Sequence, residues 1–157
     1  MSDQWAAAQQ LLGRWQGTAS GRPGTGTQVR EYRPILGGAF ILATNKTTWQ
    51  SAAGQLQGAL HEDMSVLSFD RAAGQLVMRS FYNEGFVHDY RCIDAAPDGN
   101  RFVFEAAGVE NGPPGMRARD TLVFAVDGGL EASFELAMPG EGYETYTAER
   151  LTRSDVA

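Results

Sequence analysis

A histidine and a tyrosine two residues apart, His88 and Tyr90, are the side chains in this sequence whose types and spacing best suit chemistry. They fall in residues 86–94, which alternate like a β-strand, so both side chains project to one side with Phe86 and Cys92. A neutral imidazole and a phenol among aromatic rings could orient the polar group of a ligand or bind a metal. The alternative is that both side chains hydrogen-bond neighbouring strands and line a passive core.

A carboxylate, Asp120, lies on the apolar face of a second alternating stretch, residues 116–126. A carboxylate held away from water needs a partner or takes a raised pKa, and a raised pKa would make Asp120 a candidate general base. The alternative is a structural ion pair with an inward arginine, either Arg79 or Arg33.

The other polar clusters lack the spacing of known metal or catalytic motifs. On a strand, the segment HEDM at 61–64 places His61 and Asp63 opposite Glu62, and no second cluster has ligand spacing, so no metal site is expected. There is no G-x-S-x-G motif, and Ser80 is near His88 only if the topology brings them together. The segment GRPGTG at 21–26 leads into a strand, which predicts a hairpin turn rather than a phosphate-binding loop.

Turns rich in glycine, proline, asparagine and aspartate divide the chain into ten strand-like segments. The predicted strands are residues 12–20, 27–36, 39–50, 55–69, 75–82, 86–94, 101–108, 116–126, 130–138 and 143–152. A helix is expected from Ser2 to Leu12, with Asp3 as its acidic cap and Gly13 as its end. Since tight turns join neighbours antiparallel and closure removes exposed edges, the sequence predicts an all-β fold, a ten-stranded antiparallel up-and-down barrel with a short N-terminal helix.

The alternation predicts an inner face rich in aromatic residues and methionine with scattered polar groups, as in ligand cavities. The residues expected to bind a ligand are Tyr82, Phe86, His88, Tyr90, Asp120, Phe134 and Met138. A shift of one residue in the strand at 86–94 would turn His88 outward and remove it from this set.

Composition limits the class of protein and its partners. A chain of 157 residues, 43% hydrophobic and 20% charged, suits a single domain over residues 1–157. Its net charge of -6 disfavours nucleic acid and anionic membrane surfaces. Cys92 is the only cysteine, and no segment has the pattern of a signal peptide or a membrane span, so we expect a cytoplasmic protein. Aromatic residues at a barrel end would suit either the rim of a cavity or a homodimer contact.

The first predicted strand opens with LLGRWQG, residues 11–17, in which small residues flank Trp15 and leave room for an indole across a barrel end. This G-x-W after a short helix resembles the calycin barrels, which include lipocalins, fatty-acid-binding proteins and nitrobindin-like haem barrels. Two later segments, Tyr32-Arg33-x-Ile35-Leu36-Gly37-Gly38-x-Phe40 and Ser68-Phe69-Asp70, make the chain look most like a bacterial calycin-like family catalogued as domain of unknown function 1579. That resemblance implies a barrel with a cavity and no established reaction.

The chain departs from two of the related barrels at their ligand-binding residues. Nitrobindin-like barrels bind haem through a histidine near the C-terminal strands, whereas the two histidines here are His61 and His88. Fatty-acid-binding proteins bind a carboxylate through Arg-x-Tyr on the final strand, and Tyr143, Tyr146 and Arg150 lack that spacing. No cofactor is therefore expected, and haem is the alternative.

These observations predict a module that binds a small, mostly apolar or aromatic molecule. The alternatives are an enzyme on the same barrel with His88 or Asp120 as general base, a haem-binding barrel, and an interaction domain with a solid interior.

Overall fold

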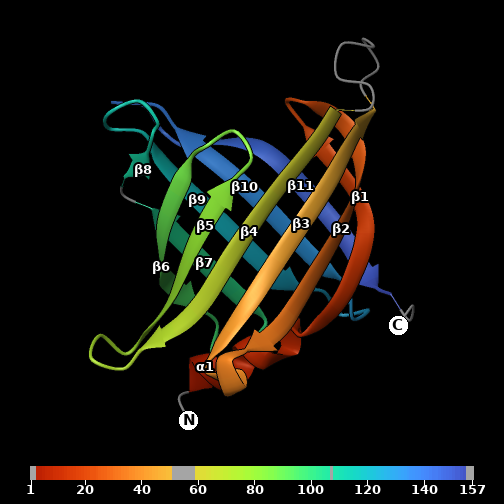
Figure 1. Ribbon diagram of the computed structural model, residues 1–157, viewed down its shortest axis with the longest axis vertical. Helices are drawn as coiled ribbons and strands as arrows, with labels where there is room; N and C mark the ends of the chain where they lie inside the picture. The colour runs from red at the N-terminus through yellow and green to blue at the C-terminus, as the bar shows by residue number, and fades with distance from the viewer. Residues whose placement is uncertain (1–2, 51–58, 107, 155–157) are drawn as a thin grey trace.

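The computed structural model describes residues 3–50, 59–106 and 108–154, and ten long antiparallel strands in it form a closed barrel with a short helix across one end (Figure 1). The helical segments are α1 (Asp3–Ala8) and the 3-10 turns η1 (Gln9–Leu11) and η2 (Leu36–Gly38). The strands are β1 (Gly13–Gly21), β2 (Gly24–Ile35), β3 (Phe40–Gln50), β4 (Ala59–Asp70), β5 (Gln75–Tyr82), β6 (Val87–Ala95), β7 (Arg101–Ala106), β8 (Val109–Glu110), β9 (Arg117–Phe124), β10 (Leu130–Ala137) and β11 (Glu144–Arg153).

The all-β barrel predicted from the turns is confirmed, and its strands lie close to the predicted ranges. Residues 55–58 of the fourth predicted strand, Ala107 of the seventh and Ser2 of the predicted helix lie outside the described residues. The rest of that helix is divided into α1 and η1. The two-residue strand β8, which was not predicted, pairs with the start of β6 beside the barrel.

The barrel is an up-and-down meander closed by its first and last strands. The hydrogen-bonded order is β5-β4-β3-β2-β1-β11-β10-β9-β7-β6, and β6 pairs with β5. Closure depends on a close approach of β1 to β11, because a Cβ atom on Gly17 would lie 1.9 Å from the carbonyl oxygen of Arg150. The second glycine of G-x-W-x-G is therefore required by the strand pairing.

The helix end of the barrel is closed by Trp15, as the sequence predicts. This indole is 0% exposed, and its Nε1 donates a hydrogen bond of 2.9 Å to the carbonyl of Leu11 in η1. The guanidinium of Arg153, at the end of β11, lies 4.2 Å from the ring centre and donates to the carbonyl of Leu12 at 2.7 Å. The side chain of Gln4 in α1 also accepts from the backbone of Leu76 at 3.2 Å. These bonds fasten the helix to several strands.

The inner face of the barrel has two chemically different halves. The half near α1, here called the apolar half, includes Trp15, Ile41, Leu67, Leu76, Met78, Phe102, Leu122, Leu130 and Leu151. The half toward the opposite end, here called the polar half, includes Gln28, Arg30, Asn45, Thr47, His61, Asp63, Ser65, Ser80, Tyr82, His88, Tyr90, Asp120, Phe134, Thr147 and Glu149. All candidate chemistry lies in the polar half.

Candidate functional site

The histidine and tyrosine of β6 both point inward and lead a chain of hydrogen bonds. His88 is 3% exposed and Tyr90 is 0% exposed, so the register keeps both on the inner face. Nδ1 of His88 lies 2.8 Å from the hydroxyl of Tyr90, and that hydroxyl lies 3.4 Å from the hydroxyl of Tyr82 in β5. The site residues predicted on these two strands are thus connected directly.

An aromatic surface extends from this chain across the barrel to β10 and β11. Ring centres are separated by 4.5 Å for Tyr82 and His88, 5.7 Å for His88 and Phe134, and 6.0 Å for Phe134 and Tyr146. Tyr146 is the extra residue of a β-bulge, since Phe134 pairs with Thr147 while the next residue of β10 pairs with Thr145. Bulges redirect side chains, and this one accompanies the edge-on contact of Tyr146 with Phe134.

The hydrogen-bonded chain consists of neutral groups at pH 7. Desolvation lowers the pKa of His88 to about 4, although the charge of Asp63 acts in the opposite direction. Desolvation also raises the pKa of Tyr90 and of Tyr82, so both phenols keep their protons. A neutral imidazole beside two phenols can both donate and accept hydrogen bonds.

Asp120 in β9 is the inward carboxylate that the sequence singles out. The ion pair with Arg79 or Arg33, given as the alternative, is wrong. Arg79 faces outward and binds Glu110 at 3.0 Å, and Arg33 is exposed. The arginine that acts on Asp120 from inside the barrel is Arg30 of β2.

The carboxyl group of Asp120 is unusually poorly compensated. It makes no hydrogen bond or ion pair with any residue that the structure describes, and its cross-strand partners are Phe104 and Phe134. Desolvation raises its pKa to about 7, with Arg30 opposing the shift and Glu149 and Asp63 adding to it. Asp120 is therefore partly protonated at neutral pH.

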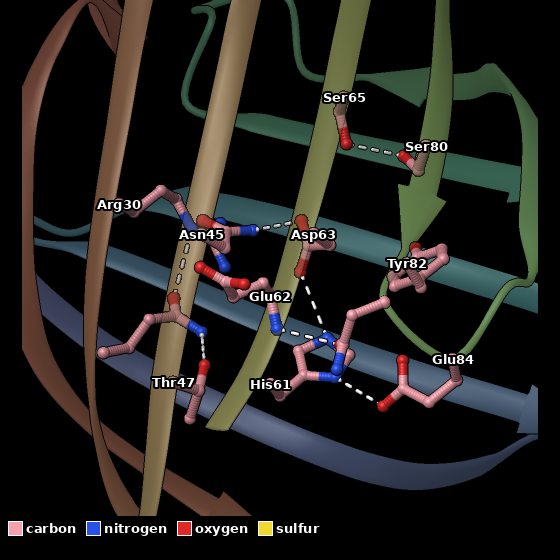
Figure 2. A network of polar contacts seen from close by, with 12 residues as sticks. Arg30, Asn45, Thr47, His61, Glu62, Asp63, Ser65, Ser80, Tyr82 and Glu84 are labelled. Atoms are coloured by element: carbon pink, nitrogen blue, oxygen red, sulfur yellow. Dashed lines mark hydrogen bonds and ion pairs between the residues drawn. The ribbon is translucent and has the colours of Figure 1, made fainter.

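Arg30 is a buried cation held by neutral partners (Figure 2). Its Nε donates to Oε1 of Gln28 at 3.1 Å, and its Nη1 donates to the hydroxyl of Tyr32 at 3.2 Å. Gln28 in turn donates to Thr47 at 2.8 Å. No carboxylate oxygen among the described residues lies within 4.0 Å of this guanidinium. Arg30 therefore influences the inner carboxylates from a distance without forming a direct ion pair.

A histidine-carboxylate cluster lies on β4 and the turn after β5 (Figure 2). Nδ1 of His61 lies 2.8 Å from Glu84, and its Nε2 lies 3.3 Å from Asp63. Asp63 also accepts a 2.9 Å hydrogen bond from Asn45. Burial alone would lower the pKa of His61, but hydrogen bonds and charge from Asp63 and Glu84 outweigh it and raise the pKa to about 9.

Two predicted site residues lie apart from this cluster. Phe86 precedes β6 and is half-buried, and Met138 follows β10 and is 44% exposed. Within the described part of the chain, no ring contact or side-chain hydrogen bond joins Phe86 or Met138 to the aromatic surface.

Sequence reasoning missed several polar residues of the inner face, chiefly Arg30, Asn45, Asp63 and Glu149. The usable signal was the alternation in β2, where Gln28 and Arg30 share a face with Tyr32. Applied to β3 and β11, the same alternation places Asn45 and Glu149 inside.

The polar half keeps contact with solvent although its side chains point inward. Tyr82, Asp120, Phe134 and Glu149 are each partly exposed, and the side chain of His61 is 27% exposed. By contrast, two grooves of about 310 and 690 Å³ are lined mostly by outward-facing strand residues, although Ala132 and Glu149 of the inner face also line the smaller one. The inner site has aromatic rings, whereas neither groove has an aromatic side chain in its lining.

The histidine, acidic and serine side chains that the structure describes on the inner face are not arranged as in a metal site, a haem site or a serine nucleophile. No group of three or more His, Cys, Asp or Glu side chains suits a metal among the described residues. Both nitrogens of His61 face carboxylates, and His88 is 3% exposed beside two rings, so neither imidazole fits a haem iron in this arrangement. Ser80 pairs with His88 across β5 and β6, but its hydroxyl lies 2.6 Å from that of Ser65.

Fold and inner face together define a closed antiparallel β-barrel with one apolar and one polar half. The barrel is similar to the crystal structure of Rv2717c from M. tuberculosis, with a TM-score of 0.73 over 98% of this chain and 99% of that chain at 18% identity. A redesigned β-barrel, b11L5F_LGL, gives a TM-score of 0.49 over 95% and 96% of the two chains at 12% identity, a likeness too slight to inform function. Neither a family model nor a curated protein matches the sequence. The likeness to Rv2717c shows the fold alone, a β-barrel.

No helix within the described residues combines the length and apolar character needed to cross a membrane.

Proposed function

We propose that this chain binds a small aromatic molecule in the polar half of the barrel. The ring of the ligand lies against Tyr82 and Phe134, and its polar group lies within reach of His88 and Asp120. The observation that carries this proposal is the juxtaposition, at a solvent-accessible inner surface, of an aromatic wall and a carboxylate without a partner among the described residues. Binding sites commonly combine an apolar wall with a few polar groups that fix orientation.

The residues that line the polar half favour a more polar ligand than the one predicted from the sequence, which was expected to meet an inner face rich in aromatic residues and methionine. The methionine Met78 belongs to the apolar half, whereas the residues around Tyr82 and Asp120 are aromatic or hydrogen-bonding. A purely aliphatic molecule would leave the carboxyl group of Asp120 without a partner, which costs binding free energy.

The test is native mass spectrometry with an absorption spectrum on protein purified from its own host. We expect a retained aromatic compound that is lost in Phe134→Leu and kept in Phe81→Leu, because Phe81 faces outward and is 38% exposed. Retention that is equal in both variants contradicts the proposal. A Soret band that is lost in His88→Ala or His61→Ala would replace it with the haem alternative.

A second candidate function is an enzyme in which Asp120 is the general base. It is favoured by the pKa of Asp120, raised to about 7 by desolvation, since a general base works best near the operating pH. With the retained compound as substrate, turnover should rise as the pH rises through about 7 and should be lost in Asp120→Asn while binding persists. If the compound binds but is not turned over at any pH, the enzyme is excluded and the binding function remains.

A further inference from the structure

The charges of the polar half are unevenly paired. Three carboxylates, Asp63, Asp120 and Glu149, face inward from β4, β9 and β11. Asp63 is satisfied by Asn45 and His61, with contacts of 2.9 and 3.3 Å. Asp120 and Glu149 have no such cationic contact among the described residues, so the interior holds more negative charge than it neutralises locally.

The pKa values of these two carboxyl groups reflect the same imbalance. Desolvation raises the pKa of Glu149, with Arg30 and a hydrogen bond from Thr147 opposing the shift. The pKa of Asp120 is raised by desolvation and by the charges of Glu149 and Asp63. A cation brought between them would relieve both costs.

The aromatic surface beside Asp120 is also suited to a cation. Phe134 is the cross-strand neighbour of Asp120, and Tyr82 stacks on Phe134 with a ring separation of 6.5 Å. The faces of phenyl and phenol rings attract cations, although only modestly at sites that keep contact with solvent. The neutral His88 adds no opposing charge.

An anionic ligand fits this interior poorly. Arg30 is the inward cation it would need, but two of its donor nitrogens already bind Gln28 and Tyr32. The field of Glu149, Asp120 and Asp63 also reaches that guanidinium. An anion would have to approach these carboxylates, in a chain of net charge -6.

We infer that the ligand is a small aromatic cation, whose charged nitrogen group contacts the carboxylate of Asp120 and whose ring lies on Phe134 and Tyr82. This inference rests on the proposed function and names the chemical class of its ligand.

A series of three near-isosteric probes tests the charge directly: benzamidine, benzamide and benzoate. Their binding is followed by NMR through the ring signals of Tyr82, Tyr90 and Phe134 in the unmodified chain. We expect benzamidine to bind roughly tenfold more tightly than benzamide, as for one charge-assisted hydrogen bond, and benzoate to bind most weakly.

Two isosteric variants locate the charge. Asp120→Asn should reduce the affinity for benzamidine by about tenfold and leave that for benzamide nearly unchanged. Asp89→Asn is the matched control, because Asp89 faces outward from β6 and lines the outer groove of about 690 Å³. If Asp89→Asn weakens benzamidine and Asp120→Asn does not, the cation binds outside and the inference fails.

The outcomes separate the two proposals. Benzamide or benzoate binding as tightly as benzamidine at the inner rings would overturn the cationic class and keep the proposed function. If none of the three probes moves these ring signals at millimolar concentration, the proposed function fails together with the inference.

Discussion

The two halves of the barrel interior are built from the same strands but differ in burial and polarity. In the apolar half, Trp15, Leu76 and Leu122 are at most 1% exposed and pack under the helix. In the polar half, Tyr82, Asp120 and Glu149 lie on the same inner face but keep solvent contact. Burial of apolar surface stabilises the fold, whereas incompletely satisfied polar groups cost stability unless something binds them. The comparison indicates that one half maintains the barrel and the other is available for a ligand.

The largest expected effect is the loss of Trp15 from the apolar half. Trp15→Ala removes a fully buried indole and its hydrogen bond to Leu11, so the free energy of unfolding should fall by about 3–5 kcal/mol. Phe134→Ala in the polar half should cost roughly 1–2 kcal/mol, since Phe134 is only half-buried and leaves a solvent-accessible space. Urea denaturation of both variants gives the two values. Equal losses would contradict the division of the interior.

The next effect comes from the carboxyl group of Asp120. Its pKa is raised by desolvation to about 7 in the folded chain, above the ordinary value of 3.8, so the unfolded state releases its proton first as the pH rises. Stability therefore falls as the pH rises from about 4 to 7 and then levels off, by roughly 1.4 kcal/mol for each unit of pKa difference at most.

Asp120→Asn removes this titration and should raise the free energy of unfolding at pH 8 by about 2–4 kcal/mol without changing it below pH 4. Denaturation curves at a series of pH values measure it, with Asp89→Asn as the exposed control. A loss of stability at pH 8 would mean that Asp120 has a favourable partner.

His88 should produce a smaller dependence of opposite sign. Desolvation lowers its folded pKa to about 4 from 6.5, so the unfolded state binds a proton first as the pH falls. Stability attributable to His88 is therefore lost between pH 6.5 and 4, by about 2–3 kcal/mol. Because Asp120 acts oppositely in this window, the effect is read as the difference between wild type and His88→Gln. If wild type and His88→Gln show the same change in stability between pH 7 and pH 4, His88 does not titrate with a lowered pKa in the folded state.

The sequence predicted the apolar half better than the polar half. G-x-W identified Trp15 because an indole between small residues has few other uses at the start of a strand. Turn residues fixed the ends of most strands, since glycine, asparagine and proline adopt conformations that interrupt them. The number of long strands and the burial of Trp15 at the helix end could therefore be predicted from local chemistry.

The polar half could be predicted only in part. Alternation placed His88, Tyr90 and Asp120 on one side of their strands, and the structure brings them to one inner surface. In β2, however, Val29 is on the outer face and Arg30 on the inner face, against the usual preference of those residues. Since tertiary pairing decides which face is inner, the partners of Asp120 depend on register across the barrel rather than on any short motif.

The smallest expected effect is at the rim of the polar half, where charge rather than packing joins the strands. Hydrogen bonds and charge from Asp63 and Glu84 outweigh burial and raise the pKa of His61 to about 9 from 6.5, so the folded state holds its proton longer as the pH rises. The stabilisation is complete below pH 6.5 and is lost as the pH rises through 9. Because the imidazole is 27% exposed, solvent screening limits the effect to about 1 kcal/mol or less.

His61→Gln should therefore remove a shallow decline in stability between pH 6.5 and 9, and high salt should flatten the same decline in wild type. An NMR titration that gives His61 a pKa near 6.5 would show that the carboxylates do not hold its proton, and the rim would then depend on packing as the apolar half does.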